Sequence, residues 1–228
     1  MTPFELLDWP CPVPGGGTRE EMALVFERQG PHRLLVLCAW FDEANKLRRQ
    51  TVAVMRRLAL SGITSVLPDL PGCNESAAPL AEQTLERWRE AAAAAAMHFG
   101  ATHVLTIRAG ALLAPADLPG WAYAPTDGRQ TLRGMLRART IASKEGGHAE
   151  RTEELQEIGR REGIELAGWR LGPAMFTAIE SAEPVGDLTS IEQSDLGGGA
   201  LWLRAEPDED HAQADALAAI IATGLATT

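Results

Sequence analysis

The chain has 228 residues, of which 45% are hydrophobic and 23% are charged, a composition typical of a globular protein with one core of ordinary size. It carries 21 Lys and Arg against 31 Asp and Glu, for a formal net charge of -10. A negative field of this kind repels phosphate backbones and anionic membrane surfaces, so general nucleic-acid binding and membrane-surface binding are not expected.

The three cysteines, at positions 11, 38 and 73, are odd in number and form no Cys-x-x-Cys pattern, which argues against a disulfide framework and a zinc site. We therefore expect reduced thiols and a cytoplasmic location. The N-terminus lacks the pattern of a signal peptide, and no stretch approaches the ~18 apolar residues of a membrane span. The sequence contains no dinucleotide fingerprint, no phosphate-binding P-loop and no metal-ligand spacing, so neither a cofactor nor a metal is expected.

The first half of the chain alternates between strand and helix patterns. After a flexible loop at 12–17, loose alternation over 21–28 predicts one strand of an antiparallel edge hairpin. Apolar runs then predict strands buried on both faces, and apolar residues at spacings of three and four predict helices between them. The predicted strands are 33–41, 63–67 and 102–107. One predicted helix begins at residue 45, and the next spans 79–99. Strand, helix, strand in this order predicts a parallel sheet with crossover helices.

The second half continues the pattern with shorter elements. Strands are predicted at 121–125, 164–167, 187–193 and 200–205, and helices at 128–143, 151–161 and 173–181. Asp210 and Gln213 form an N-cap pair for a last helix, whose inward face is Ala214, Leu217, Ala218, Ile221 and Leu225. We expect one α/β domain over 1–228, with a mostly parallel sheet, helices on both faces, and a small helical lid at about 126–182.

The segment 102–114, THVLTIRAGALLA, is where an apolar strand meets a sharp turn. In an α/β hydrolase this corner carries the nucleophile in a Gly-x-Ser-x-Gly turn, and here the five residues are Thr106, Ile107, Arg108, Ala109 and Gly110. Arginine keeps its proton at any usable pH and cannot act as the nucleophile. The sequence therefore indicates a hydrolase scaffold more firmly than it indicates hydrolysis.

Three blocks sharpen this interpretation: FDEANKLRR at 41–49, LPDLPGCNES at 67–76 and RAGALLA at 108–114. Together they resemble the exosortase A system-associated hydrolases of the second type. That family is similar to α/β hydrolases and occurs with exosortase and exopolysaccharide loci in Gram-negative bacteria. The resemblance implies an accessory role in such a system, and the arginine at the elbow looks like a feature of the group. We therefore expect a non-catalytic or weakly catalytic accessory protein.

Arg108 has two interpretations. On the elbow it would project over the carboxyl edge of the sheet, where it could clamp a small acyl or anionic ligand together with the N-terminus of the next helix. Alternatively it bridges a buried acid such as Asp69 or Glu75. Phe41 and Asp42, in the turn after the first buried strand, occupy with the N–H of Ala109 the place of an oxyanion hole. Asp42 and Glu43 are also expected to pair with Lys46, Arg49 or Arg108.

An active ester or thioester hydrolase remains the competing hypothesis, with Ser76, Cys73 or an activated water as nucleophile. Asp195 and His211 follow the last predicted strands in the order acid then histidine. The simpler interpretations are a turn or cap for Ser76, an inert thiol for Cys73, and surface or capping groups for Asp195 and His211. A third hypothesis is a partner-binding module in which the basic helix from Lys46 to Arg57 meets an acidic surface.

Overall fold

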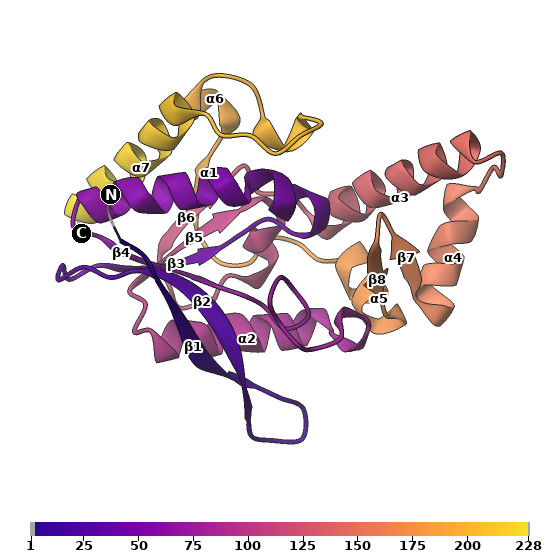
Figure 1. Ribbon diagram of the computed structural model, residues 1–228, viewed down its shortest axis with the longest axis horizontal. Helices are drawn as coiled ribbons and strands as arrows, with labels where there is room; N and C mark the ends of the chain where they lie inside the picture. The colour runs from indigo at the N-terminus through magenta and orange to yellow at the C-terminus, as the bar shows by residue number, and fades with distance from the viewer. Residues whose placement is uncertain (1–2, 228) are drawn as a thin grey trace.

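A seven-stranded sheet runs through the middle of the part of the chain that the computed structural model describes, residues 3–227 (Figure 1). Its order is β1-β2-β4-β3-β5-β6-β9. In this order the neighbouring strands β4, β3, β5, β6 and β9 are parallel to one another. The strands are β1 (Glu5–Pro12), β2 (Thr18–Phe26), β3 (Arg33–Leu37), β4 (Thr64–Pro68), β5 (His103–Ile107), β6 (Gly120–Tyr123) and β9 (Thr189–Ile191). The mostly parallel α/β architecture predicted from the sequence is confirmed.

Helices cover both faces of this sheet. Helices α1 (Phe41–Leu60) and α7 (His211–Ala226) lie together on one face, and α2 (Leu85–His98) lies on the other (Figure 1). The predicted inward face of α7 is buried at all five positions, and Asp210 caps the helix by accepting the N–H of Gln213 at 3.1 Å. Within residues 3–227, no helix is both long and apolar enough to cross a membrane.

Residues between β6 and β9 form a cap region that extends beyond the end of the sheet, on the right of Figure 1. It consists of α3 (Gly128–Glu145), α4 (Thr152–Glu162), the hairpin β7 (Ile164–Leu166) and β8 (Trp169–Leu171), and α5 (Pro173–Glu180). Its buried side chains, including Leu132, Leu155 and Phe176, belong to the same hydrophobic cluster as Trp88 of α2. The cap region therefore shares a core with the sheet.

The antiparallel edge hairpin expected around 21–28 is confirmed. The strand expected there is β2, which pairs with β4 on one side and with the outermost strand, β1, on the other. Strand β1 was not predicted, because it contains two prolines and its first four residues are exposed. It joins the sheet through Trp9 and Cys11, which are buried.

Three other predictions were wrong in extent or type. The helix expected over 79–99 is divided into a short turn, η1 (Leu80–Glu82), and α2, because Thr84 caps α2 by accepting the N–H of Arg87 at 3.2 Å. The strand expected over 200–205 is a 3₁₀ turn, η3 (Leu201–Leu203), with no neighbouring strand. The helix expected directly after the elbow is a 3₁₀ turn, η2 (Arg108–Leu113), which ends just before Pro115.

Two helical glycines of the cap region provide a matched test of its packing. A Cβ at Gly159 would lie 2.8 Å from the ring of Phe176, whereas a Cβ at Gly134 would meet nothing within 4 Å. We expect Gly159→Ala to lower the free energy of unfolding by about 1–3 kcal/mol through overpacking. Gly134→Ala should raise it by roughly 0.5–1 kcal/mol, because alanine is the better helix former. Urea denaturation checks both; equal effects of the two substitutions would contradict this packing.

Candidate functional site

The site lies where β3, β5 and β6 end, at the carboxyl edge of the parallel sheet. Phe41 and Arg108 follow two of these ends, and each has a φ of 54°, in the left-handed region that bulky residues rarely adopt. A Cβ at Gly110 would lie 2.2 Å from the carbonyl oxygen of Leu37, so only glycine allows the elbow to pack on the end of β3. The backbone thus forms a strained nucleophile-type elbow with arginine at its apex.

The guanidinium of Arg108 is held from three directions. Its Nε and Nη2 donate to the two carboxylate oxygens of Glu43, at 3.0 and 3.2 Å, and its Nη1 donates to the carbonyl of Ala124 at 2.8 Å. The indole of Trp202 lies over it, with 4.3 Å from Cζ to the ring centroid. A bidentate ion pair and a cation–π contact leave the side chain only 15% exposed.

The partner of Arg108 is therefore Glu43, one of the pairings expected from the sequence, and neither Asp69 nor Glu75, the alternatives named for a buried acid. Asp69 accepts from the amide of Asn74 at 2.6 Å and lies 3.5 Å from Nη1 of Arg48. Glu75 is exposed. Glu43 reaches Arg108 because the first turn of α1 begins directly after β3, beside the elbow on β5.

The helix end expected beside Arg108 is absent from the described structure. Residues 108–113 form a 3₁₀ turn of six residues, so no α-helical N-terminus follows the elbow. Ala109, whose N–H was expected to contribute to an oxyanion hole, is 1% exposed and does not line the cavity above the elbow. An anion clamp made of Arg108 and a helix end is not formed here.

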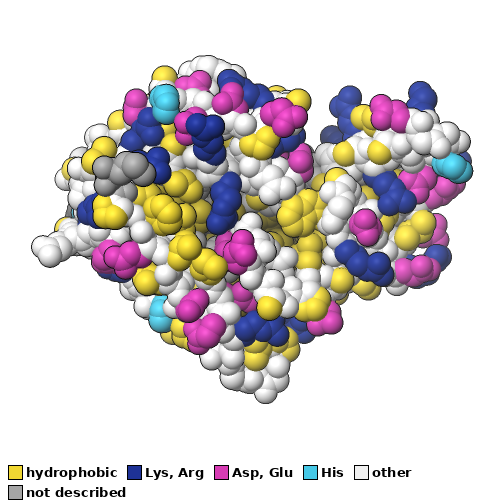
Figure 2. Space-filling view, in the orientation of Figure 1, with side chains coloured by type: hydrophobic (Ala, Val, Ile, Leu, Met, Phe, Trp, Pro, Cys, Tyr) yellow, Lys and Arg dark blue, Asp and Glu magenta, His cyan; other side chains and the backbone are white. Residues whose placement is uncertain are grey.

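A cavity of about 460 Å³, the elbow cavity, lies above Arg108, between α1, α3 and η3. In Figure 2 the surface is notched between the body of the molecule and the cap region on the right. The walls are mainly apolar, and the charged groups in them are paired: Asp42 binds Lys46 at 2.8 Å, and Glu43 binds Arg108. The lining residues are Trp40, Phe41, Asp42, Glu43, Lys46, Arg108, Thr126, Gln130, Thr131, Gly134, Met135, Ala138, Ala167, Trp202 and Leu203.

Neither candidate nucleophile has a histidine partner among the described residues. The hydroxyl of Ser76 donates to Glu21 at 2.9 Å and accepts the N–H groups of Gly72 and Ala78 at 2.9 and 3.2 Å. It thus stabilises the turn after β4, as a turn serine does. Burial raises the pKa of the Cys73 thiol well above its usual range, which leaves the unreactive protonated form.

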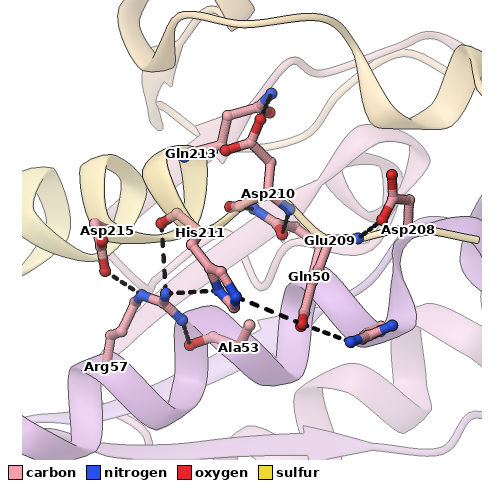
Figure 3. A network of polar contacts seen from close by, with 10 residues as sticks. Gln50, Ala53, Arg57, Asp208, Glu209, Asp210, His211, Gln213 and Asp215 are labelled. Carbon is pink, nitrogen blue, oxygen red and sulfur yellow. Dashed lines mark hydrogen bonds and ion pairs between the residues drawn. The ribbon is translucent and has the colours of Figure 1, made fainter.

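The structure does not bring Asp195 and His211 together as a catalytic pair. Asp195, in α6 (Gln193–Leu196), accepts the N–H of Glu192 at 2.8 Å as one half of a capping box. His211 begins α7 on the outer surface, with its side chain 75% exposed between Arg57 and Glu209 (Figure 3). Among the described residues, no hydrogen bond joins a histidine ring to a serine or a cysteine. In the same part of the chain, no three His, Cys, Asp or Glu groups gather as a metal site requires.

The basic face of α1, considered as a partner-binding surface, is largely neutralised by neighbouring acids. Lys46 pairs with Asp42, Arg48 with Asp69, Arg49 with Glu209 and Arg57 with Asp215. Figure 3 shows how the segment before α7 lies along α1 and supplies part of these contacts. Of the basic residues from Lys46 to Arg57, only Arg56 has no acidic partner among the described residues.

Sequence reasoning missed Trp202 and Thr126 as cavity residues. Trp202 fell within a predicted strand, and only the 3₁₀ turn of η3 places its ring over Arg108 and edge-on to Tyr123 at 5.9 Å. Thr126 follows β6, and its buried hydroxyl has no partner among the described residues. Only a general feature of the sequence could have indicated them. Thr126 follows the strand predicted over 121–125 and Trp202 lies within the one predicted over 200–205, and ligands of such sheets bind at the carboxyl edge.

Comparison with known proteins shows the fold. No family model matches the chain, and no curated protein matches it. Among solved structures, alpha/beta hydrolase domain-containing protein 10 from mouse is similar with a TM-score of 0.55 and 12% identity, over 91% of this chain and 95% of that one. The ferulic acid-bound Est1E from Butyrivibrio proteoclasticus gives 0.54 and 12%, over 91% and 95%. A hydrolase from Agrobacterium vitis S4 gives 0.53 and 17%, over 77% and 71%. The chain has the α/β-hydrolase fold.

Restoring the elbow serine should not restore hydrolysis. Arg108→Ser places a hydroxyl at the apex, yet no histidine in the described structure is positioned to take its proton, because His211 lies on the outer face. We expect no turnover of p-nitrophenyl butyrate above buffer, and a loss of stability of about 1–3 kcal/mol from the unpaired Glu43. Turnover that appears in Arg108→Ser and disappears in the double variant with His211→Ala would contradict this arrangement.

The buried carboxyl of Glu21 should give a pH-dependent stability. Burial raises its pKa above the ordinary 4.5, and the hydrogen bond from Ser76 only partly opposes this. The folded chain then holds a proton that the unfolded chain has lost, so stability falls as the pH rises from the ordinary value through the raised one. Glu21→Gln should therefore gain stability relative to the wild type as the pH rises above the ordinary carboxyl pKa, measured by urea denaturation. Glu20→Gln, at an exposed position on the same strand, is the control, and the same gain there would refute the assignment.

Proposed function

We propose that this chain is a ligand-binding member of the α/β-hydrolase fold that does not hydrolyse its ligand. The ligand is a small molecule with an acyl or other largely apolar body that enters the elbow cavity. The observation that carries the proposal is the ion-paired guanidinium of Arg108, which fills the position of the nucleophile at the bottom of an apolar-walled cavity. A volume of about 460 Å³ lies within the range of small-molecule sites.

The charges of the cavity favour the acyl form of this ligand over an anionic one. Both cations in the wall already have acidic partners, Arg108 with Glu43 and Lys46 with Asp42. An anionic group would therefore compete with a carboxylate for each of them, and would gain little. A neutral carbonyl or hydroxyl has better options, because Gln130 and Thr131 line one wall and the buried hydroxyl of Thr126 lacks a partner in the described structure.

We further propose that the cap region, over about 126–182, acts as the lid of this cavity within a single domain spanning the chain. Helix α3 provides its inner wall through Gln130, Met135 and Ala138. The sequence motifs at 41–49, 67–76 and 108–114 support a role beside an exosortase or exopolysaccharide system, and a cytoplasmic location agrees with three free cysteines. Co-purification of tagged chain with proteins of such a system tests this part separately.

Blocking the cavity should abolish ligand binding. Ala138→Trp places a large ring in the cavity from an exposed position of α3, while Ala142→Trp adds the same ring one turn further along, outside the cavity lining. We expect octanamide, followed by tryptophan fluorescence of Trp40 and Trp202, to bind Ala138→Trp at least about tenfold more weakly than Ala142→Trp. Octanoate should bind the wild type more weakly than octanamide does.

The same samples distinguish binding from catalysis. p-Nitrophenyl octanoate and octanoyl thioesters should show no turnover above buffer with the wild type. Turnover lost specifically in Ser76→Ala or Cys73→Ala would overturn the proposal and restore an ester or thioester hydrolase. Equal binding of octanamide to Ala138→Trp and Ala142→Trp would remove the elbow cavity as its site.

A further inference from the structure

A second cavity lies on the opposite flank of α3, between α3 and α4. We name it the α3–α4 groove, and its volume is about 390 Å³. Helix α3 lies between this groove and the elbow cavity: residues of α3 line both, and the two cavities share no lining residue. Its lining residues are Arg129, Leu132, Arg133 and Leu136 from α3, Thr152, Gln156 and Arg160 from α4, and Glu180 from α5.

The groove carries positive charge that the structure does not neutralise. Arg129 and Arg133 stand one turn apart on α3, about 6 Å along its axis, and neither has an acidic partner among the described residues. Arg160 faces them from α4 and is held by Glu180 through two hydrogen bonds, at 2.7 and 2.8 Å. The lining thus contains three guanidiniums and one carboxylate, in a chain whose net charge is -10.

The start of α4 adds free donors at one end of the groove. Thr152 is the first residue of this 11-residue helix, and the preceding Arg151 makes no side-chain cap, so the N–H groups of the first turn remain available. Glu153 and Glu154 in the same turn reduce its positive potential, but neither lines the groove. The bottom of the groove is well packed, because the side chains of Leu132 and Leu136 are 2% and 1% exposed and belong to the hydrophobic core.

We infer that the α3–α4 groove binds a ligand through a phosphate group. Two unpaired guanidiniums present forks of N–H donors to one narrow space, and a tetrahedral, doubly charged phosphate can accept from both at once. A third guanidinium, fixed by Glu180, and the donor Gln156 close the opposite wall. The groove is independent of the proposed acyl site, since the paired charges of the elbow cavity leave no comparable cation there.

Charge-removing variants on α3 test this inference. Inorganic pyrophosphate and glycerol phosphate are titrated at low ionic strength by calorimetry, because salt screens exposed charges. Arg129→Gln and Arg133→Gln should each weaken pyrophosphate binding at least about tenfold. Arg137→Gln is the matched control: it removes the same exposed charge from the next turn of α3, outside the groove. Circular dichroism establishes that the variants fold.

A parallel arm identifies the source of the phosphate group. Vesicles of phosphatidylcholine with and without phosphatidic acid are tested for co-sedimentation with the wild type and the three variants. Loss confined to Arg129→Gln and Arg133→Gln supports the inference, with a free ligand if the titration responds and with a lipid headgroup if only the vesicles do. An absence of binding in both arms overturns it, as does equal loss in all three variants, which would show diffuse attraction to a basic helix.

Discussion

The bidentate ion pair between Arg108 and Glu43 is the contact on which the candidate site depends. It joins the turn after β5 to the first turn of α1, and the third donor of Arg108 reaches the carbonyl after β6. The indole of Trp202, which belongs to the C-terminal segment, covers the guanidinium of Arg108. Four segments distant in sequence are thus held at one sheet edge by one guanidinium. Removing one partner of a largely buried pair leaves the other charge uncompensated, so the arginine and its acid constrain each other.

The arrangement differs from a hydrolase site in more than its nucleophile. The acid that follows the last strand, Asp195, is used as a helix cap, and His211 starts a helix on the outer surface. The sheet also ends at β9, because the segment around Trp202 forms a turn over Arg108 and adds no further strand. In an α/β hydrolase the catalytic histidine follows the acid in the chain, and here the segment after Asp195 forms a turn that places Trp202 over Arg108.

The sequence predicted what short-range periodicity controls. The central strands, the inward face of α7 and the position of the elbow follow from local runs of apolar residues, and each was found where the pattern indicated. For Arg108 the sequence offered several acidic partners, Glu43 among them, and did not decide between them. Asp69 and Glu43 both follow parallel strands and end at the same sheet edge, so only the direction in which each turn leaves its strand decides between them. Strand β1 and the turn η3 depend in the same way on tertiary contacts.

The two flanks of α3 show why one cavity is neutral and the other is basic. Acidic residues are favoured in the first turn of a helix, and α1 places Asp42 and Glu43 there, within reach of Lys46 and Arg108. The acids in the first turn of α4 do not line its groove, so only Glu180 contributes a carboxylate to that space. Acids at the start of α1 therefore neutralise the cations beside the elbow. The acids at the start of α4 lie outside the groove and leave Arg129 and Arg133 unpaired among the described residues. The two proposed sites, one for an apolar body and one for a phosphate group, therefore lie on opposite sides of one helix.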